Sequence, residues 1–572
     1  MAGSIRLSQR LCLLLLRRSP LSKPLRPFTR TFSHKVSEPN ELFEYTSGRW
    51  IYNEAQRYAA RRRVFDVPEL KRLAAESVNK RIQDVARFEK LAEGGFNRSF
   101  LVTMSDGAQL IARIPYPTTG PKYLVVASEV ATLDYLRVHG VPVPEVYGYS
   151  ATADNAAGTE FIFMEYMSGR NLRDVWFDLH EEQCLTVMQS IVDIETRLFA
   201  IEFPASGSLF YTEDLRSTAN AAFVPIVDAP SKGRFCVGPE TTLRMWSGKR
   251  SNLDVDRGAY KTPEAVLAAV ANKELAYLAQ HGTPLHPLQP IHREFHNYQK
   301  QSHLDYTKVL QDYLRIAPYL VPKGFEFLSA PTIRHPDLQP SNILVSADLN
   351  VTGLIDWQHC SVLPLFLQCG IPNSIQNYGD TVSESMHTPA LPDDFPDLDA
   401  NNQSEQLEIL RRRHIHYYYS LCTGLRNPLH AIALTHSLSI LRRKLYTHAS
   451  YPWEGDIVSL KADLVHLTQN WEKLSSPTDA QDPCPISYPE DEASKCLDLN
   501  AQQIEADEQM QIFRNYIGIG SDGWLPSHNY DASKQREMEL KELALKAAES
   551  DEERIKLSEN WIFRDFDEEE YA

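Results

Sequence analysis

The sequence predicts an α+β fold of two lobes, in which a small lobe with a β-sheet and a helix precedes a larger, mainly helical lobe. Residues 100–104 and 109–114 alternate like two strands, and the Asp106–Gly107 pair between them indicates a β-hairpin. Apolar residues recur at helical spacing over 124–139, where Gly140 would end the helix. Helical periodicity then dominates the rest of the chain, in segments 181–200, 263–280, 306–317, 405–425, 430–448 and 457–474.

These patterns divide the chain into five predicted parts. They are a transit peptide (1–34), an N-terminal helical extension (35–84), a small lobe (85–168), a helical lobe with insertions (169–474), and an acidic linker with a helical tail (475–572). Within the helical lobe, residues 205–260 and 376–403 show no regular periodicity and are expected to be irregular. In the tail we expect helices near 498–514 and 533–560.

Composition limits the possible classes of protein. A chain of 572 residues with 43% hydrophobic residues can bury a real core and form two to three structural units. The net charge of −16 argues against nucleic acid as the main partner. No stretch is long and apolar enough to predict a transmembrane helix. The eight cysteines contain no C-x-x-C pair, which favours reduced, buried thiols over zinc ligation or a disulfide framework.

The first residues are typical of a mitochondrial address. They are rich in Arg and Ser and lack acidic residues, and Arg6, Arg10, Leu11 and Leu15 can lie on a cationic amphipathic helix. The stretch 30–33 resembles a matrix-protease site with cleavage after Phe32. The alternative is a disordered basic tail. We expect recognition by the mitochondrial import machinery and location in the matrix.

The most informative stretch is His335-Pro336-Asp337-Leu338-Gln339-Pro340-Ser341-Asn342, followed by two apolar strands and Asp356. Phosphoryl transfer explains these residue types, because an Asp must orient or deprotonate the attacking hydroxyl and an Asn and a second Asp must hold Mg2+. The pattern therefore predicts Asp337 and His335 as catalytic residues, with His335 supporting the loop. It predicts Asn342 and Asp356 as metal ligands.

This stretch, with Ile355-Asp356-Trp357, resembles the catalytic core of aminoglycoside phosphotransferases and choline kinases. The resemblance covers residues 85–450. It implies a two-lobed, protein-kinase-like enzyme that uses ATP and Mg2+ to phosphorylate a hydroxyl of a small molecule. It does not identify that acceptor.

The same resemblance implies a nucleotide site in the small lobe. Gly94, Gly95 and Asn97 look like the loop that covers the phosphates, and Glu165 and Met167 look like the hinge that meets adenine.

Arg113 occupies the place of the family's phosphate-binding lysine, and Glu129 matches the acid that pairs with that cation. Arginine is a planar fork rather than a compact ammonium, so this replacement is not conservative. The glycine loop also departs from the G-x-G-x-x-G pattern.

Three functions stay open at this stage. The first is an active small-molecule kinase, and the second is a catalytically silent nucleotide-binding scaffold needed for mitochondrial maintenance, which Arg113 would favour. The third is nucleotidyl transfer, for which no particular residue argues. Residues 45–50 and 356–359 also resemble a mitochondrial subgroup of the family called altered inheritance of mitochondria protein 9.

Overall fold

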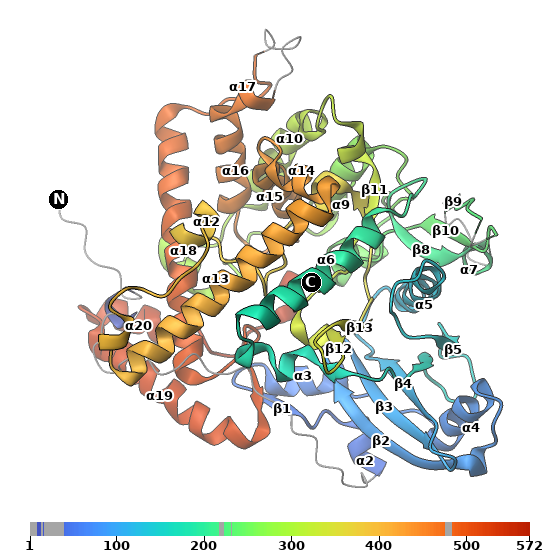
Figure 1. The fold of residues 1–572 in the computed structure, drawn as a ribbon. Coiled ribbons are helices and arrows are strands. Elements are labelled where there is room, and N and C mark those ends of the chain that lie inside the picture. Colours follow the sequence, from blue (N-terminus) through green and yellow to red (C-terminus); the bar gives the residue numbers. More distant parts are fainter. Residues whose placement is uncertain (1–8, 13–14, 16–38, 217–221, 230–231, 475–482) are drawn as a thin grey trace.

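The computed structural model describes the chain except for residues 1–8, 13–14, 16–38, 217–221, 230–231 and 475–482. Two lobes are visible in Figure 1, with the sheet lobe below the helical lobe. The predicted α+β architecture, a small antiparallel sheet followed by many helices, is present. Among the described residues, no helix is long and apolar enough to cross a membrane.

The small lobe is a five-stranded antiparallel sheet with the order β2-β3-β4-β6-β5. The predicted hairpin consists of β3 and β4, and Gly107 at its turn has a φ of 87°, a conformation that glycine adopts without strain. The strands are β2 (Val85–Glu93), β3 (Asn97–Met104), β4 (Gln109–Pro115), β5 (Val146–Ser150) and β6 (Phe161–Glu165).

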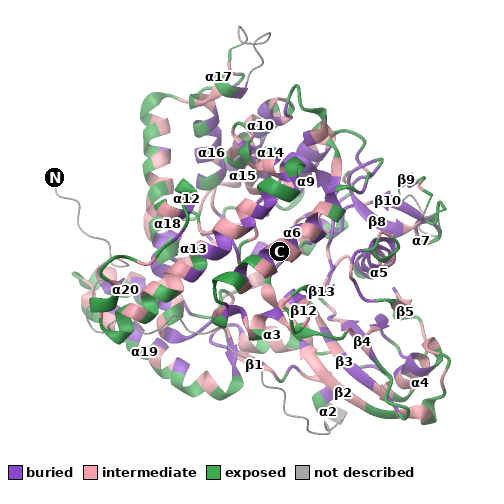
Figure 2. Ribbon diagram, viewed as in Figure 1, coloured by how far each residue is buried: buried purple, intermediate pink, exposed green. Residues whose placement is uncertain are grey.

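A helix covers each face of this sheet, as the alternation of side chains along a strand requires. Phe100 and Val102 lie in one apolar cluster with Leu70 and Ala74 of α4 (Val67–Ser77), whereas Met164 lies in another with residues of α5 (Lys122–Val138). Helix α5 is buried over almost its whole surface (Figure 2), because the helical lobe packs on its outer side.

The large lobe is a set of packed helices around one extensive apolar core. Its main helices are α6 (Glu181–Phe199), α9 (Pro263–His281), α10 (His303–Ile316), α13 (Ala400–Arg426), α14 (Pro428–Thr435), α15 (Ser439–Ser450) and α16 (Val458–Gln469). Short helices join them at α8 (Leu243–Trp246), α11 (Leu365–Gln368), α12 (Thr381–Ser385) and α17 (Trp471–Leu474). This lobe also contains two small sheets: β7 (Arg170–Asn171) with β12 (Ile343–Val345) and β13 (Val351–Leu354), and β11 (Pro331–Ile333) with β14 (Val362–Pro364).

Residues 205–260 form a folded insertion rather than the irregular segment that we expected. They contain a three-stranded sheet of β8 (Ser208–Tyr211), β9 (Val224–Pro225) and β10 (Phe235–Gly238), with α7 (Thr212–Arg216) beside it. The sheet packs against α5, and its Phe210 and Cys236 are fully buried with Val126 of that helix. Strands of two to four residues are too short to give a recognisable alternation, which explains why the sequence did not reveal them.

The N-terminal extension and the C-terminal tail meet. Strand β1 (Gly48–Trp50) pairs antiparallel with β15 (Trp524–Pro526), and the Trp50 indole donates a hydrogen bond of 3.2 Å to Asp522. The extension adds α2 (Pro39–Phe43) and α3 (Glu54–Arg61), and the tail adds α18 (Glu490–Ile517), α19 (Tyr530–Ala547) and α20 (Asp551–Glu559).

Three predictions at the ends of the chain differ from the structure or fall outside it. Helix α18 begins within the predicted linker, and the single helix expected over 533–560 is broken into α19 and α20. The predicted cleavage after Phe32 and residues 475–482 of the linker lie outside the described residues.

Candidate phosphotransfer site

The predicted catalytic loop connects β11 to β12, and a tight hairpin returns the chain to Asp356. Strands β12 and β13 pair with Ile343 opposite Leu354, and the Ile355 amide donates a hydrogen bond of 3.0 Å to the Asn342 carbonyl. This ladder holds Asn342 and Asp356 at the same edge, although they are separated in sequence. Asp356 itself adopts a φ of 68°, a left-handed conformation that is uncommon outside glycine.

His335 ties the two ends of this arrangement together. Its Nε2 donates a hydrogen bond of 2.9 Å to the Ile355 carbonyl, and its Nδ1 accepts one of 3.1 Å from the Asp337 amide. Burial lowers the pKa of the imidazole, which keeps the ring neutral with its proton on Nε2. The ring also packs edge-on against the fully buried Trp357. His335 therefore positions the loop.

Asp337 is exposed, and two amides orient its carboxylate. Asn342 Nδ2 donates to both the backbone carbonyl of Asp337, at 2.9 Å, and its Oδ2, at 3.1 Å. The Gln339 amide donates to the same Oδ2. Both amides donate to Oδ2, which leaves Oδ1 of Asp337 available as an acceptor. This geometry suits a carboxylate that orients a hydroxyl group or takes its proton.

Arg113 links the two lobes at the site. Its Nη1 lies 2.9 Å from Glu129 on α5, and its Nη2 contacts Asp356 and donates a hydrogen bond of 3.0 Å to Gln358. Arginine makes this bridge possible because its fork presents donors in two directions. The Arg113 side chain is 9% exposed, whereas the Asp356 side chain is 40% exposed.

The charges of this cluster shift one another's pKa. Burial raises the pKa of Glu129 to about 7, although Arg113 opposes the shift. Burial has the same tendency at Asp356, but there the Arg113 guanidinium outweighs it and the pKa of the carboxyl is lowered. Asp356 is therefore an anion near neutral pH.

The glycine loop between β2 and β3 lies over the segment that follows Asp356. The Gly94 amide donates 2.8 Å to the Asn97 carbonyl, and a side chain on Gly95 would meet no atom within 4 Å, so that side of the loop is open. The Asn97 amide lies 2.9 Å from Gln358, and Phe96 packs edge-on against His359.

The N-terminal extension supports this loop from behind. Glu93, the last residue of β2, is fully buried, and its Oε2 accepts hydrogen bonds of 2.9 Å from the amides of both Thr46 and Ser47. Its Oε1 accepts one of 3.0 Å from Arg98. A folded segment outside the two lobes thus fixes the base of the glycine loop.

The predicted hinge begins at Glu165, the last residue of β6. The Glu165 amide donates 2.8 Å to the Glu145 carbonyl, and its carboxylate accepts hydrogen bonds from Arg137, at 3.2 Å, and from the Glu145 amide. Met167 packs on Gly353 of β13, where an added side chain would come within 2.9 Å of its sulfur. The hinge therefore contacts the hairpin that carries Asp356.

Comparison with known proteins identifies the fold family. The model of the phosphotransferase enzyme family matches residues 87–366. A subtelomeric hrmA-associated cluster protein of Aspergillus fumigatus is 31% identical over 509 residues, covering 83% of this chain and 96% of that protein. The chain belongs to the phosphotransferase enzyme family. The predicted resemblance and the predicted fold class are thereby confirmed.

Two of the other similar proteins are more distant. Altered inheritance of mitochondria protein 9 of Clavispora lusitaniae is 22% identical, covering 89% of this chain and 90% of that protein. Among solved structures, the streptomycin–ATP–APH(2")-IIa ternary complex aligns with a TM-score of 0.34 and 13% identity, covering 70% of this chain and 97% of that one.

Members of a phosphotransferase family are expected to hold a divalent cation, and the residues at this edge fit Mg2+. Asn342 uses its Nδ2 on Asp337, which leaves its Oδ1 as the atom that can accept a cation. Asp356 offers a partly exposed carboxylate. Mg2+ prefers oxygen ligands of this kind together with phosphate oxygens and water.

Part of the support for the segment that follows Asp356 was not predicted. His359, in a left-handed conformation, donates through Nδ1 a hydrogen bond of 2.7 Å to the Thr241 carbonyl of the insertion. Ser208 of β8 donates 2.8 Å to the Cys360 carbonyl and accepts 3.0 Å from the Thr241 amide. No sequence signal could have found these contacts, because the insertion looked irregular.

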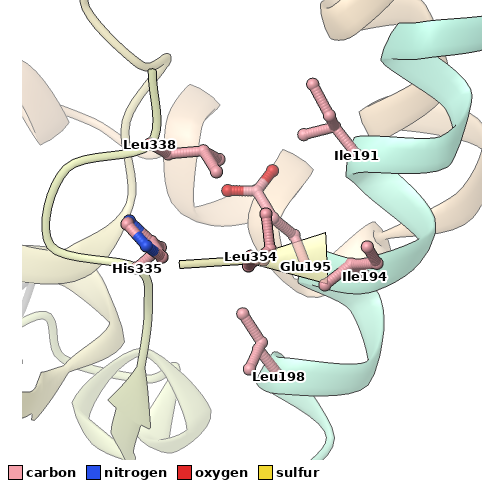
Figure 3. Close-up of a pocket in the computed structure, with 7 residues that line it drawn as sticks. All are labelled: Ile191, Ile194, Glu195, Leu198, His335, Leu338 and Leu354. Carbon is pink, nitrogen blue, oxygen red and sulfur yellow. The ribbon is translucent and has the colours of Figure 1, made fainter. Parts of the chain in front are cut away.

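A small cavity lies behind the catalytic loop, between it and α6. Figure 3 shows Ile191 and Leu198 of α6 facing His335 and Leu338 across it, and Ile194, Glu195 and Leu354 complete the lining. Glu195 is 2% exposed and its carboxylate is paired with Arg334 and Tyr419. Apart from Glu195 and His335 the lining is apolar, and it does not include Asp337, so this cavity is a packing space behind the loop.

Proposed function

We propose that this protein is an ATP- and Mg2+-dependent phosphotransferase whose acceptor is a hydroxyl of a small molecule. The observation that carries the proposal is the grouping of Asp337, Asn342 and Asp356 at one edge, with Asp337 exposed and oriented by amides. Membership of the phosphotransferase family supports the reaction class.

Each residue of the catalytic loop would have a separate role. Asp337 would orient the acceptor hydroxyl and take its proton, while His335 and Asn342 keep its carboxylate in place. Asn342 and Asp356 would hold Mg2+, which supplies charge neutralisation on the phosphate oxygens.

On the nucleotide side, Gly94, Gly95 and Asn97 would cover the phosphates, and Arg113, paired with Glu129, would contact them. The Glu165–Met167 hinge would receive the adenine.

We further propose a mitochondrial matrix location and the division into lobes at 85–168 and 169–474. The basic leader supports import, and several relatives carry a mitochondrial name, among them altered inheritance of mitochondria protein 9 of Kluyveromyces lactis.

A second candidate is a catalytically silent nucleotide-binding scaffold. One observation favours it: the Arg113 guanidinium rests on Asp356, the carboxylate that a metal ion would need. If Arg113 keeps that position when nucleotide binds, metal-assisted transfer is blocked while binding persists.

The deciding experiment measures ATP binding and hydrolysis by the full chain, with and without Mg2+, beside Asp356→Ala and Asp337→Asn. For the phosphotransferase, Asp356→Ala removes Mg2+-dependent binding, and Asp337→Asn keeps binding but abolishes turnover. For the scaffold, the wild type binds nucleotide without turnover. The absence of binding at millimolar ATP would contradict both.

A further inference from the structure

The leader described above as a targeting signal is partly folded onto the other end of the chain. Residues 9–12 are helical, and Leu11, Cys12 and Leu15 are only 3%, 7% and 5% exposed. They belong to one apolar cluster with side chains from all three tail helices: Ala506 and Met510 of α18, Leu540 and Ala544 of α19, and Leu557 of α20. We call this surface of α18–α20 the tail groove.

The spacing of the buried leader residues is that of one helix face. Residues at positions i, i+1 and i+4 lie side by side on a helix, so Leu11, Cys12 and Leu15 can enter the tail groove together. Laying the apolar face of an amphipathic helix into an apolar groove is a recurring mode of peptide recognition.

The rim of the tail groove is acidic and contacts the basic side of the leader. Arg10 Nη1 lies 2.6 Å from Glu549, and its Nη2 pairs with Glu553 at the start of α20. The same Nη1 donates a hydrogen bond of 3.2 Å to the Ala547 carbonyl at the end of α19. Gln9 donates one of 3.1 Å to Glu505 of α18. Each tail helix therefore contributes a polar contact as well as an apolar one.

These contacts fit a class of ligand rather than a single sequence. The tail groove can recognise two features of a helix. One is a row of apolar side chains on one face, and the other is a neighbouring guanidinium that pairs with Glu549 and Glu553. Both features define a basic amphipathic helix. The groove also continues the β1–β15 contact through Ile51 and Leu525, which lie in the same apolar cluster, so its floor belongs to the folded protein.

Removal of the leader after Phe32, as the sequence predicts, would leave an apolar groove with an acidic rim. We propose that the tail groove is a docking site for basic amphipathic helices, held by the chain's own leader in the precursor and taken by such a helix of a partner protein after processing. This proposal is independent of phosphotransfer, because none of its residues belongs to the candidate site.

The test uses the full chain with its own leader released by Arg10→Glu, Leu11→Asp and Leu15→Asp. A fluorescent peptide of residues 5–18 is added in trans, and its anisotropy reports binding. We expect saturable binding to the released variant, and binding at least about tenfold weaker to the wild type, whose groove is already filled. A second peptide of unrelated sequence, with Arg and the apolar pattern kept, should bind within about tenfold of the first.

A charge swap separates docking from misfolding. Glu549→Lys with Glu553→Lys in the released variant should weaken the native peptide at least about tenfold, and the Arg10→Glu peptide should recover that loss. The matched control is Glu559→Lys with Glu569→Lys, which changes the net charge equally at exposed positions without a contact to Arg10. Circular dichroism checks that each variant is folded.

Three results would overturn the proposal. They are no saturable binding to the released variant, equal weakening by the control pair, and binding of the native leader peptide but not of the unrelated peptide with the same pattern. The third result would mean that the tail groove binds the leader sequence specifically and no other helix of this class. ATP hydrolysis by the released variant stays as in the wild type if the two sites are independent.

Discussion

Asp337 and Arg113 reach the candidate site from opposite lobes, and their charged groups differ in exposure and in the partners that they contact. The Asp337 carboxylate is exposed, and within the described residues it accepts hydrogen bonds from the side-chain amides of Asn342 and Gln339. The Arg113 guanidinium is buried and bridges two carboxylates, Glu129 and Asp356. Amide donors orient a carboxylate and leave its charge in place, whereas a salt bridge neutralises both partners.

In the proposed phosphotransferase, this difference separates the proton acceptor from the cation on the nucleotide side. The predicted catalytic loop presents an exposed carboxylate, that of Asp337. The Arg113 guanidinium would have to move away from Asp356, or share it, before a metal ion could bind that carboxylate fully. Regulation or loss of activity is therefore expected to act through Arg113 rather than through Asp337.

The largest expected effect is on turnover, from Asp337→Asn. Loss of the proton acceptor should lower kcat about a thousandfold and leave nucleotide affinity nearly unchanged. Steady-state kinetics and ATP binding measure the two quantities. Asp348→Asn, an exposed aspartate in the turn of the same hairpin, is the matched control and should keep wild-type turnover. An Asp337→Asn variant as active as that control would contradict the role of Asp337.

Arg113→Met removes the shared cation and tests the other side of the comparison. It leaves Glu129 buried without its partner, so the free energy of unfolding should fall by about 2–3 kcal/mol, a value reduced because Asp356 stays partly hydrated. Denaturant titration measures it. Arg87→Met, an exposed arginine on the same sheet, should change stability by less than about 0.5 kcal/mol. Equal losses of unfolding free energy in the two variants would mean that the Arg113 bridge adds no stability beyond that of an exposed arginine.

Arg113→Lys sharpens the comparison further. A lysine ammonium is a single point charge and would not bridge Glu129 and Asp356 with the same fork geometry. We expect Asp356 to become more available, so that Mn2+, used as a spectroscopic probe, binds more tightly in the presence of ATP. Weaker Mn2+ binding in this variant would show that Arg113 assists the metal site instead of competing with it.

The pH dependence of stability should report Glu129. Burial raises its pKa in the folded protein to about 7 from an ordinary value of 4.5, so between these values the folded state binds more protons than the unfolded state. The free energy of unfolding therefore falls as pH rises from about 4.5 to 7. Comparison of the wild type with Glu129→Gln isolates this contribution, because the groups outside the Arg113 cluster titrate alike in both. A stability difference that stays constant across this window would contradict it.

The smallest effect is expected from Ser208, behind the predicted metal-ligand segment. Ser208→Ala removes a buried hydroxyl that bonds Cys360 and Thr241, and should cost about 1–2 kcal/mol of stability with little effect on kcat. Ser251→Ala, which removes an exposed hydroxyl bonded to Gly248, should cost less. A larger loss of kcat than of stability would give the insertion a direct part in catalysis.

The sequence by itself determined several local elements of this protein. The hairpin of β3 and β4 follows from alternation and an Asp-Gly turn, and helix α5 follows from apolar spacing and Gly140. The order His335, Asp337, Asn342, Asp356 is compact enough that one loop and one hairpin bring these residues together. Such features depend on consecutive residues, so a periodic pattern or a turn residue is sufficient to predict them.

Only the tertiary structure decided the contacts between distant segments. Arg113 lies 243 positions from Asp356, and the Trp50 indole reaches Asp522 across 472 positions. The sequence likewise did not show that Glu93 is held by Thr46 and Ser47, or that residues 205–260 form a sheet beneath His359. The sequence does not distinguish a solvated charged residue from one buried in a salt bridge, because tertiary packing determines which partner lies beside it.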